Sequence, residues 1–257
     1  MTGQHADAKE LYMQVGILSK MKAHIVPHGR KVYSIRSGIV GGMKMNLDLR
    51  HQTQMYLGLS EREIYSAIRR FSRDAMTAVD IGSAFGEYTL FFLQKTSARH
   101  VFAFDPDEGS RQNFYNNLLL NGFGNDRRLS FSTKFVGERD DGSTIKLDSL
   151  IDRIESPCVI KVDVDGGELS VLQGAASLTK TRDVRWVVET HSKALELGCL
   201  EFFRDAGYQS QIVENAWWRR IVPEQRPIEH NRWLLAFRGQ TSSVVRISSN
   251  SSKSFQS

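Results

Sequence analysis

The sequence predicts an α/β protein built on a seven-stranded, mostly parallel sheet that helices cover on both faces. Short β-branched runs alternate with amphipathic segments between residues 78 and 238, a pattern typical of successive βαβ units. The chain has 257 residues, 40% apolar and 25% charged, which is enough for one sizeable core and an appendage. A glycine-containing turn, "DIGSAFGE", joins the first predicted strand to an apolar helix.

The predicted strands and helices follow one another without an internal repeat. One helix begins near Gly86, a second follows Pro106 and has Gly122 as its C-cap, and a third covers 168–178 with Leu169, Leu172 and Ala176 on one face. The predicted strands are 77–81, 100–105, 129–136, 158–164, 184–191, 208–214 and 232–238.

The two ends of the chain differ from this central pattern. Residues 1–74 are interpreted as an N-terminal α+β extension that packs against the sheet domain or caps its substrate side. The extension contains a helix-like segment (7–21), strand-like residues (30–49) and a helix over 60–71, where Ser60 and Glu63 have capping-box spacing. The main domain is assigned to 75–238, and the Ser-rich segment 239–257 is expected to be a disordered tail.

Composition and charge exclude several classes of protein. No apolar stretch approaches the roughly 18 to 20 residues that a membrane span needs, and the N-terminus lacks a signal-peptide layout. We therefore expect a cytoplasmic protein. The net charge of +5 is spread along the chain rather than gathered in a stripe, which argues against nucleic acid as a partner. Cys158 and Cys199 are expected to be reduced core residues.

The glycine turn indicates what kind of ligand it can bind. It reads D-x-G-x-x-x-G, with Asp80, Gly82, Ser83 and Gly86 at the carboxyl end of the strand, where open α/β sheets bind ligands. It lacks the G-x-G-x-x-G spacing of a dinucleotide loop, and the Asp80 carboxylate would repel a pyrophosphate. The same carboxylate suits a cationic ligand, such as the sulfonium and ammonium groups of S-adenosyl-L-methionine.

The next strand adds a second acid. Asp105 ends "HVFAFD", a position from which a carboxylate can accept hydrogen bonds from two ribose hydroxyls. Ribose occurs in both NAD and S-adenosylmethionine, so Asp105 does not distinguish between them. Asp80 and Asp105, at successive strand ends, together predict a cofactor site.

Five blocks in series resemble the FkbM family of S-adenosylmethionine-dependent methyltransferases. They are "VDIGSAFGEYTL", "VFAFDPDEGSRQNFYNNLLLNG", "IKLDSLID", "IKVDVDGGELSVLQGA" and "VVETH", and the resemblance covers roughly Ala78 to Tyr208. It implies a Rossmann-like class I methyltransferase fold with the last strand antiparallel, and O-methylation of a hydroxyl on a sugar, glycolipid or secondary metabolite. The sequence departs from the family pattern at Asp105, where Glu is more usual, and at "DVDGGE", where "DVEGAE" is usual.

Candidate catalytic residues follow the fourth and fifth strands of the main domain. Alternation places Lys161, Asp163 and Asp165 on one side of the chain. Lys161 and Asp163 either neutralise one another, or Asp163 faces the acceptor hydroxyl as a base or a metal ligand. Asp165 and the following glycines would shape the site, and Glu168 is assigned to the dipole of the next helix.

The fifth strand ends with Glu189 and His191. His191 is either an ordinary hydrogen-bonded histidine or a general base, because its unperturbed pKa lies near neutrality. Asp163, Glu189 and His191 could also hold one divalent cation that lowers the pKa of the acceptor hydroxyl. On the sequence alone the metal-free arrangement is favoured.

Other functions share this fold class. An RNA or DNA methyltransferase is the main rival, but no Asp-Pro-Pro-aromatic stretch follows Asp163, and Pro157-Cys158 begins its strand rather than ending it. An NAD(P)-dependent oxidoreductase or a non-catalytic nucleotide-binding module are further alternatives. We expect a small-molecule or glycan acceptor. The connection with Trp217, Trp218 and Arg220 would stack on a sugar, bind a phosphate or close the core.

Overall fold

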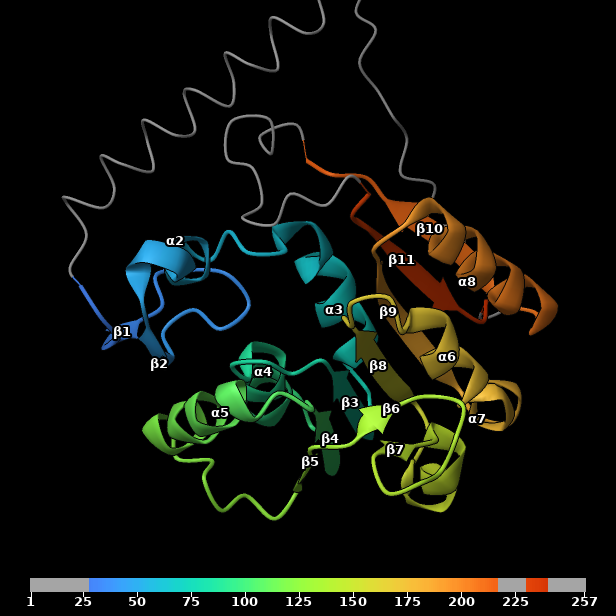
Figure 1. The fold of residues 1–257 in the computed structure, drawn as a ribbon, viewed down its shortest axis with the longest axis horizontal. Coiled ribbons are helices and arrows are strands. Elements are labelled where there is room, and N and C mark those ends of the chain that lie inside the picture. The colour runs from blue at the N-terminus through green and yellow to red at the C-terminus, as the bar shows by residue number, and fades with distance from the viewer. Residues whose placement is uncertain (1–27, 217–229, 240–257) are drawn as a thin grey trace, which may run out of the picture.

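The structure is a computed structural model, and it describes residues 28–216 and 230–239 (Figure 1). The predicted helix over 7–21, the connection around Trp217 and all of the Ser-rich segment beyond residue 239 lie outside these ranges. Within them, none of the helices has the length and apolar character needed to cross a membrane.

A seven-stranded sheet forms the centre of the molecule, with the strand order β10-β11-β9-β8-β3-β4-β5. All neighbouring strands pair in parallel except β11, which is antiparallel to both β9 and β10. The predicted sheet, including its antiparallel last strand, is confirmed. Its strands are β3 (Thr77–Ile81), β4 (His100–Phe104), β5 (Leu129–Ser132), β8 (Cys158–Val162), β9 (Val184–Thr190), β10 (Gln209–Val213) and β11 (Arg232–Phe237).

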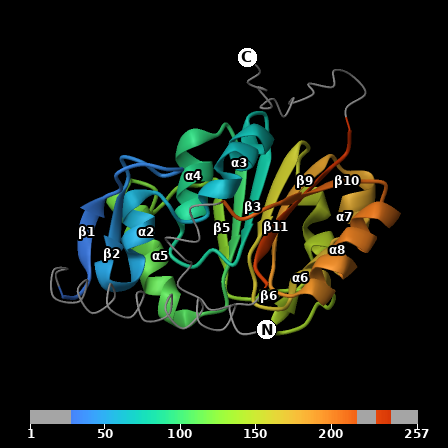
Figure 2. The same cartoon turned by 90° about the horizontal axis from the view of Figure 1, so that it is seen from above.

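Helices cover both faces of the sheet, as Figure 2 shows. β3 and β8 are buried along their whole length, as expected for central parallel strands between two helical layers. One layer consists of α3 (Tyr65–Ser72), α4 (Glu87–Lys95) and α5 (Glu108–Leu120). The other consists of η2 (Leu147–Arg153), α6 (Glu168–Gln173), α7 (Ala176–Thr181) and α8 (Lys193–Asp205).

Capping residues fix where α4 and α5 begin. Gly86 precedes α4 with a left-handed φ of 83°. Asp107 caps α5, and its carboxylate accepts hydrogen bonds from the amides of Gly109 and Ser110. Asn121 is the C-cap of α5, and Gly122 follows it with a φ of 82°, so the glycine predicted as the C-cap lies one residue beyond the cap, at a left-handed position that favours glycine.

The described part of the N-terminal region shares the core of the α3–α5 layer. Its hairpin, β1 (Lys31–Ser34) and β2 (Lys44–Leu47), precedes α2 (Leu49–Leu57). Met45 and Leu47 of β2 are fully buried in the same apolar cluster as Phe92 and Phe114. Asn117 and Asn121 of α5 accept hydrogen bonds from backbone amides of β2 at 2.7 and 3.0 Å.

Three sequence predictions are corrected by the structure. The helix expected over 60–71 is a short 3-10 helix, η1 (Arg62–Ile64), followed by α3, and no side chain caps α3. Ser60 and Glu63 therefore form no capping box at a helix start, because Glu61 adopts a left-handed conformation (φ 47°) and breaks the geometry that the box requires.

The other corrections concern a strand and a helix. The strand expected over 129–136 stops at Ser132, and β6 (Phe135–Val136) pairs instead with β7 (Thr144–Ile145) in a separate small sheet. The helix expected over 168–178 is split into α6 and α7 around Gly174. A Cβ at Gly174 would lie 1.9 Å from the carbonyl oxygen of Gly137, so this close backbone approach coincides with the break.

Candidate functional site

The loop between β3 and α4 lies against the end of β8. Gly82 has a φ of 79°, and a Cβ there would lie 1.8 Å from the carbonyl oxygen of Asp163. The amide of Asp163 donates to the carbonyl of Ile81 at 2.9 Å, so the backbone ladder continues past both strands. Only glycine fits at Gly82, because both its φ and the neighbouring carbonyl exclude a side chain.

The amides of this loop are engaged within the protein. Those of Gly82 and Ser83 donate to the carbonyl of Phe104, and that of Gly86 donates to the carbonyl of Ser83. The Ala84 amide donates to Asp105 Oδ2 at 2.6 Å. A pyrophosphate cradle would direct such amides toward the ligand, whereas these four point to protein acceptors.

Asp105 joins the loop to the start of α5. Its Oδ2 binds the Ala84 amide, while its Oδ1 accepts from the Asp107 amide at 2.9 Å and from Ser110 Oγ at 3.2 Å. A carboxylate has about four acceptor positions, and these contacts use three. The buried Asp105 thus fixes the loop and keeps capacity for one further donor.

Asp80 is fully buried below the loop. Its Oδ2 accepts a hydrogen bond from Thr89 Oγ1 at 2.7 Å, and its Oδ1 has no hydrogen-bond partner among the described residues. Burial raises the pKa of Asp80, although the charge of Lys161 and the Thr89 hydrogen bond act in the opposite direction. Ser83 Oγ is likewise buried without a hydrogen bond in the described structure.

Lys161 and Asp163 form an ion pair at the end of β8. The distance from Lys161 Nζ to Asp163 Oδ2 is 3.0 Å, and the side chains are 3% and 13% exposed. Lys161 Nζ also lies 4.6 Å from the ring centre of Tyr88 and 5.7 Å from that of Trp233. Burial lowers the pKa of Lys161, but the charge of Asp163 and other acids outweighs it and raises the pKa overall.

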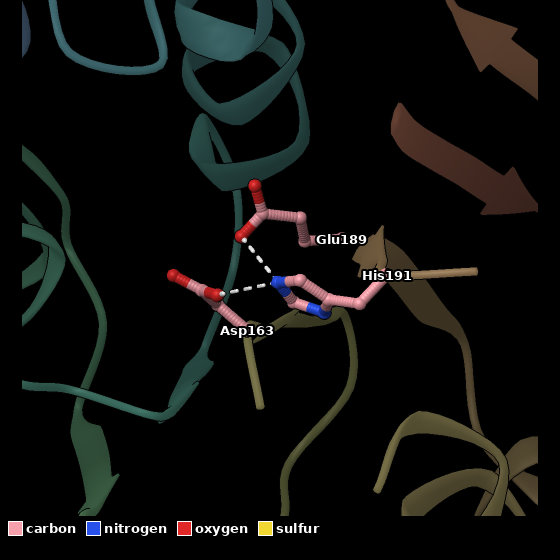
Figure 3. Close-up of side chains that lie close together, drawn as sticks. All are labelled: Asp163, Glu189 and His191. Atoms are coloured by element: carbon pink, nitrogen blue, oxygen red, sulfur yellow. Dashed lines mark ion pairs between the residues drawn. The ribbon is translucent and has the colours of Figure 1, made fainter. Parts of the chain in front are cut away.

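The side chains of Asp163, Glu189 and His191 converge where β8 and β9 end (Figure 3). His191 Nε2 lies 3.9 Å from Asp163 Oδ1 and 3.6 Å from Glu189 Oε2. Burial and the neighbouring Asp163 carboxylate raise the pKa of Glu189. The three side chains offer one ligand atom each within 4.8 Å of one another.

Glu168 holds the other side of the His191 ring. Its Oε1 lies 2.5 Å from His191 Nδ1 and accepts from the His191 amide at 3.2 Å. Burial lowers the pKa of His191, but the Glu168 hydrogen bond and the charges of Glu168, Asp163 and Asp165 raise it overall. Asp165 Oδ1 lies 3.6 Å from Nε2, yet the Asp165 side chain is 76% exposed.

A comparison with known protein families matches residues 122–210 to the methyltransferase FkbM domain. The matched segment contains Asp163, Glu168, Glu189 and His191, and it runs from the end of α5 into β10. The matched segment makes up about a third of the 257 residues, and over this segment the chain is similar to the FkbM methyltransferases.

A solved methyltransferase structure shares the fold of this chain. A crystal structure of methyltransferase FkbM from Methylobacillus flagellatus KT superposes with a TM-score of 0.53 at 21% identity, over 64% of this chain and 44% of that one. The chain therefore spans less than half of that protein's length.

Two further neighbours have lower scores. Precorrin-6y C5,15-methyltransferase from Geobacter metallireducens GS-15 has a TM-score of 0.46 at 15% identity, over 69% of this chain and 88% of that one. An rRNA methylase from Streptococcus thermophilus has a TM-score of 0.47 at 13% identity, over 70% and 98%. No curated protein matches the sequence.

The glycine loop precedes the matched segment, and the polar atoms around it fit a ligand that has hydrogen-bonding groups. Asp80 and Ser83 carry buried polar atoms without hydrogen bonds in the described residues, and such atoms ordinarily find a partner. Asp105 lies at the end of β4 with spare acceptor capacity. Asp80, Gly82, Ser83, Gly86 and Asp105 stay the predicted cofactor-binding residues.

Sequence reasoning missed the contacts of two residues, that of Glu168 with His191 at the end of β9 and that of Asn117 with the glycine loop. Glu168 does begin α6, as expected, but it is fully buried and hydrogen-bonded to His191. Asn117 Nδ2 donates to the carbonyl of Phe85 in the glycine loop at 2.9 Å while its Oδ1 binds β2. An acid at a helix start and an asparagine inside a helix carry no sequence signal for such long-range contacts.

The remaining candidates are residues of the connection that leads into β11 and the two cysteines. Trp217, Trp218 and Arg220 fall outside the described residues. His230 and Arg232 both contact the buried carboxylate of Glu196, at 3.2 and 2.6 Å. Cys158 and Cys199 are buried and unpaired with each other, as predicted.

Proposed function

We propose that the chain is an S-adenosylmethionine-dependent O-methyltransferase that acts on a hydroxyl of a sugar, glycolipid or secondary metabolite. The match of residues 122–210 to the methyltransferase FkbM domain supports methyl transfer. The choice of an oxygen acceptor follows from the site, where carboxylates and a histidine are available to a hydroxyl proton and no thiol nucleophile is present. Cys158 is fully buried at the start of β8, and burial raises the pKa of its thiol.

The observation that carries the proposal is the excess of carboxylates around one buried cation. Lys161 is 2% exposed, and several acids raise its pKa through their charge, namely Asp163, Glu61, Asp80 and Glu189. A buried site with this charge balance disfavours a pyrophosphate and favours a positively charged ligand. S-adenosylmethionine carries such a charge at the sulfur from which the methyl group leaves.

The protein's own groups position the acceptor and remove its proton. S-adenosylmethionine supplies the methyl group, and its C–S bond breaks with the electron pair left on sulfur while the O–C bond forms. Asp163, Glu189 and His191 form the surface at which the acceptor hydroxyl is bound and loses its proton. Lys161 holds Asp163 Oδ2, so that Asp163 Oδ1 faces the cluster. Alignment of this kind contributes much of the rate of an in-line displacement.

Thermal unfolding with candidate ligands tests the cofactor. S-adenosylhomocysteine at about 100 times its Kd should raise the midpoint by about 5 °C or more, and NAD should leave it unchanged. A shift with NAD but none with S-adenosylhomocysteine would favour an oxidoreductase and reject the proposal. A shift with both ligands would reject the charge argument against pyrophosphate.

Labelled S-adenosylmethionine then tests the acceptor. Glycan and metabolite extracts should take up base-stable label at a hydroxyl, and total RNA should take up none. Label found in RNA alone would show that the rival nucleic-acid activity is correct. No transfer to any extract, despite cofactor binding, would favour a non-catalytic module.

A further inference from the structure

His191 Nε2 is one of the buried polar atoms of the candidate site that lack a hydrogen bond in the described part of the chain. The side chain is only 8% exposed, and Nε2 makes no hydrogen bond among the described residues. It is aimed between the carboxylates of Asp163 and Glu189 (Figure 3). A buried ring nitrogen without a hydrogen bond ordinarily finds a partner, and these two carboxyl groups lie beside it across the site.

The distances match a shared cation better than direct hydrogen bonds. Nε2 lies 3.9 Å from Asp163 Oδ1 and 3.6 Å from Glu189 Oε2, beyond the upper limit of about 3.2 Å for an N–H···O hydrogen bond. Ligand atoms bound to one cation at about 2.1 Å are roughly 3.0 to 3.4 Å apart in octahedral or tetrahedral geometry. The two distances from Nε2 exceed this range by about 0.5 and 0.2 Å.

Glu168 prepares His191 for such a role. Its carboxylate can only accept, so the proton of the neutral ring lies on Nδ1 and the lone pair of Nε2 faces Asp163 and Glu189. Glu168 is fully buried at the start of α6, which fixes the plane of the ring. A carboxylate behind a histidine is the usual outer-shell partner of a metal-ligating imidazole.

We propose that Asp163, Glu189 and His191 bind one divalent cation, with Glu168 as the positioning residue. Two carboxylate oxygens and one imidazole nitrogen suit a first-row divalent metal, and the oxygen-rich set favours Mn²⁺ among these. Three protein ligands leave coordination positions for water and for an oxygen of the acceptor. The geometry thus reverses the metal-free preference drawn from the sequence.

The cation would supply what the proposed function needs at the acceptor. A hydroxyl bound to a divalent metal has a lowered pKa, so its proton can leave to solvent before the oxygen takes the methyl group. This role rests on the proposed O-methyltransferase function. Binding of the metal itself does not, and it can be measured without cofactor or acceptor.

Mn²⁺ binding to the EDTA-treated full chain tests the site. Electron paramagnetic resonance of free Mn²⁺ should show about one equivalent bound. His191→Ala and Asp163→Asn should each weaken binding at least about tenfold, since removing a ligand or its outer-shell partner typically costs that much. Glu168→Gln keeps an acceptor for the ring and should weaken binding by about tenfold.

Asp165→Asn is the matched control. Asp165 is also 3.6 Å from Nε2, but its side chain is 76% exposed, so its charge is screened and its loss should change Mn²⁺ affinity less than about fivefold. An equal loss in Asp165→Asn would overturn the assigned ligands in favour of a diffuse acidic surface. Absence of saturable Mn²⁺ binding in the parent chain would overturn the site itself.

Measuring S-adenosylhomocysteine stabilisation on the same variants separates the two proposals. Mn²⁺ binding without a cofactor shift would leave the metal site standing and reject the methyltransferase proposal. A rise in the unfolding midpoint with S-adenosylhomocysteine but no Mn²⁺ binding would reject the metal site and leave the methyltransferase proposal standing. The variants should keep their cofactor shift, which shows that a lost metal site does not reflect unfolding.

Discussion

The glycine loop and the paired ends of β8 and β9 face the same edge of the sheet but are built in opposite ways. Four loop amides donate to acceptors within the protein, so the loop is complete as a backbone structure. At the strand ends, His191 Nε2 is buried without a hydrogen bond in the described residues. The comparison teaches that backbone hydrogen bonds fix the shape of the loop, whereas at the strand ends a buried ring nitrogen lies beside two carboxyl groups without a hydrogen bond to either.

Adding a methyl group at Gly82 should have the largest effect, because it disrupts the backbone of the glycine loop. Gly82→Ala must accept both a φ of 79° and a carbonyl oxygen 1.8 Å from the new Cβ. We expect a loss of at least about 3 kcal/mol in the free energy of unfolding, measured in urea, together with loss of the S-adenosylhomocysteine shift.

Gly122→Ala is the control for strain alone. Gly122 has a φ of 82° and nothing within 4 Å of its added Cβ, so its substitution should cost only about 1 kcal/mol. Equal losses in the two variants would mean that the contact between the loop and Asp163 does not constrain the loop.

Removing the charge of Asp163 tests the role of the side chains at the ends of β8 and β9. Asp163→Asn should lower methyl transfer about 100-fold or more, a size typical of a lost acid-base group, while S-adenosylhomocysteine still raises the unfolding midpoint. Asp152→Asn, at an exposed position of η2, should keep transfer near the parent level. Transfer near the parent level in Asp163→Asn would show that the acceptor proton leaves elsewhere.

Periodicity predicted the sheet because strand identity is a local property. The runs at 77–81 and 158–162 are short and apolar, and they lie where the structure has β3 and β8. Alternation also placed Asp163, Glu189 and His191 at neighbouring strand ends, where the structure brings them together. Their catalytic roles stay predictions.

The pairing of β6 and the orientation of the His191 ring depend on tertiary contacts that the sequence does not reveal. Phe135 and Val136 have strand propensity, but their partner is the local pair Thr144–Ile145 rather than β4. The His191 ring orientation depends on Glu168, from a different element. Neither contact leaves a pattern in the residues near it, because each depends on how distant segments pack.

Asn117 connects the glycine loop to the β1–β2 hairpin, and its removal should destabilise the loop without unfolding it. Asn117→Ala removes two buried hydrogen bonds, to Asn46 and Phe85, and should cost about 2 kcal/mol with weaker S-adenosylhomocysteine binding by calorimetry. Asn121→Ala also removes contacts to β2, through Lys44, but it leaves the loop contact. Matching losses of cofactor affinity in both variants would assign the effect to the hairpin rather than to the loop.

Glu87 shows how the buried charge near the loop depends on pH. Burial, with a contribution from the charge of Glu61, raises the pKa of Glu87 from 4.5 to about 8. Between these values the folded protein keeps a proton that the unfolded chain releases. The stability from Glu87 is therefore fully present below about pH 4.5 and is lost as pH rises toward 8, by up to about 1.4 kcal/mol per pH unit.

Urea unfolding of Glu87→Gln across this pH range should remove that slope, whereas the stability curve of Glu201→Gln, at an exposed position of α8, should run parallel to that of the parent. Parallel curves for Glu87→Gln as well would mean that Glu87 is charged in the folded state, so that the carboxylate excess at the loop is larger than its burial indicates.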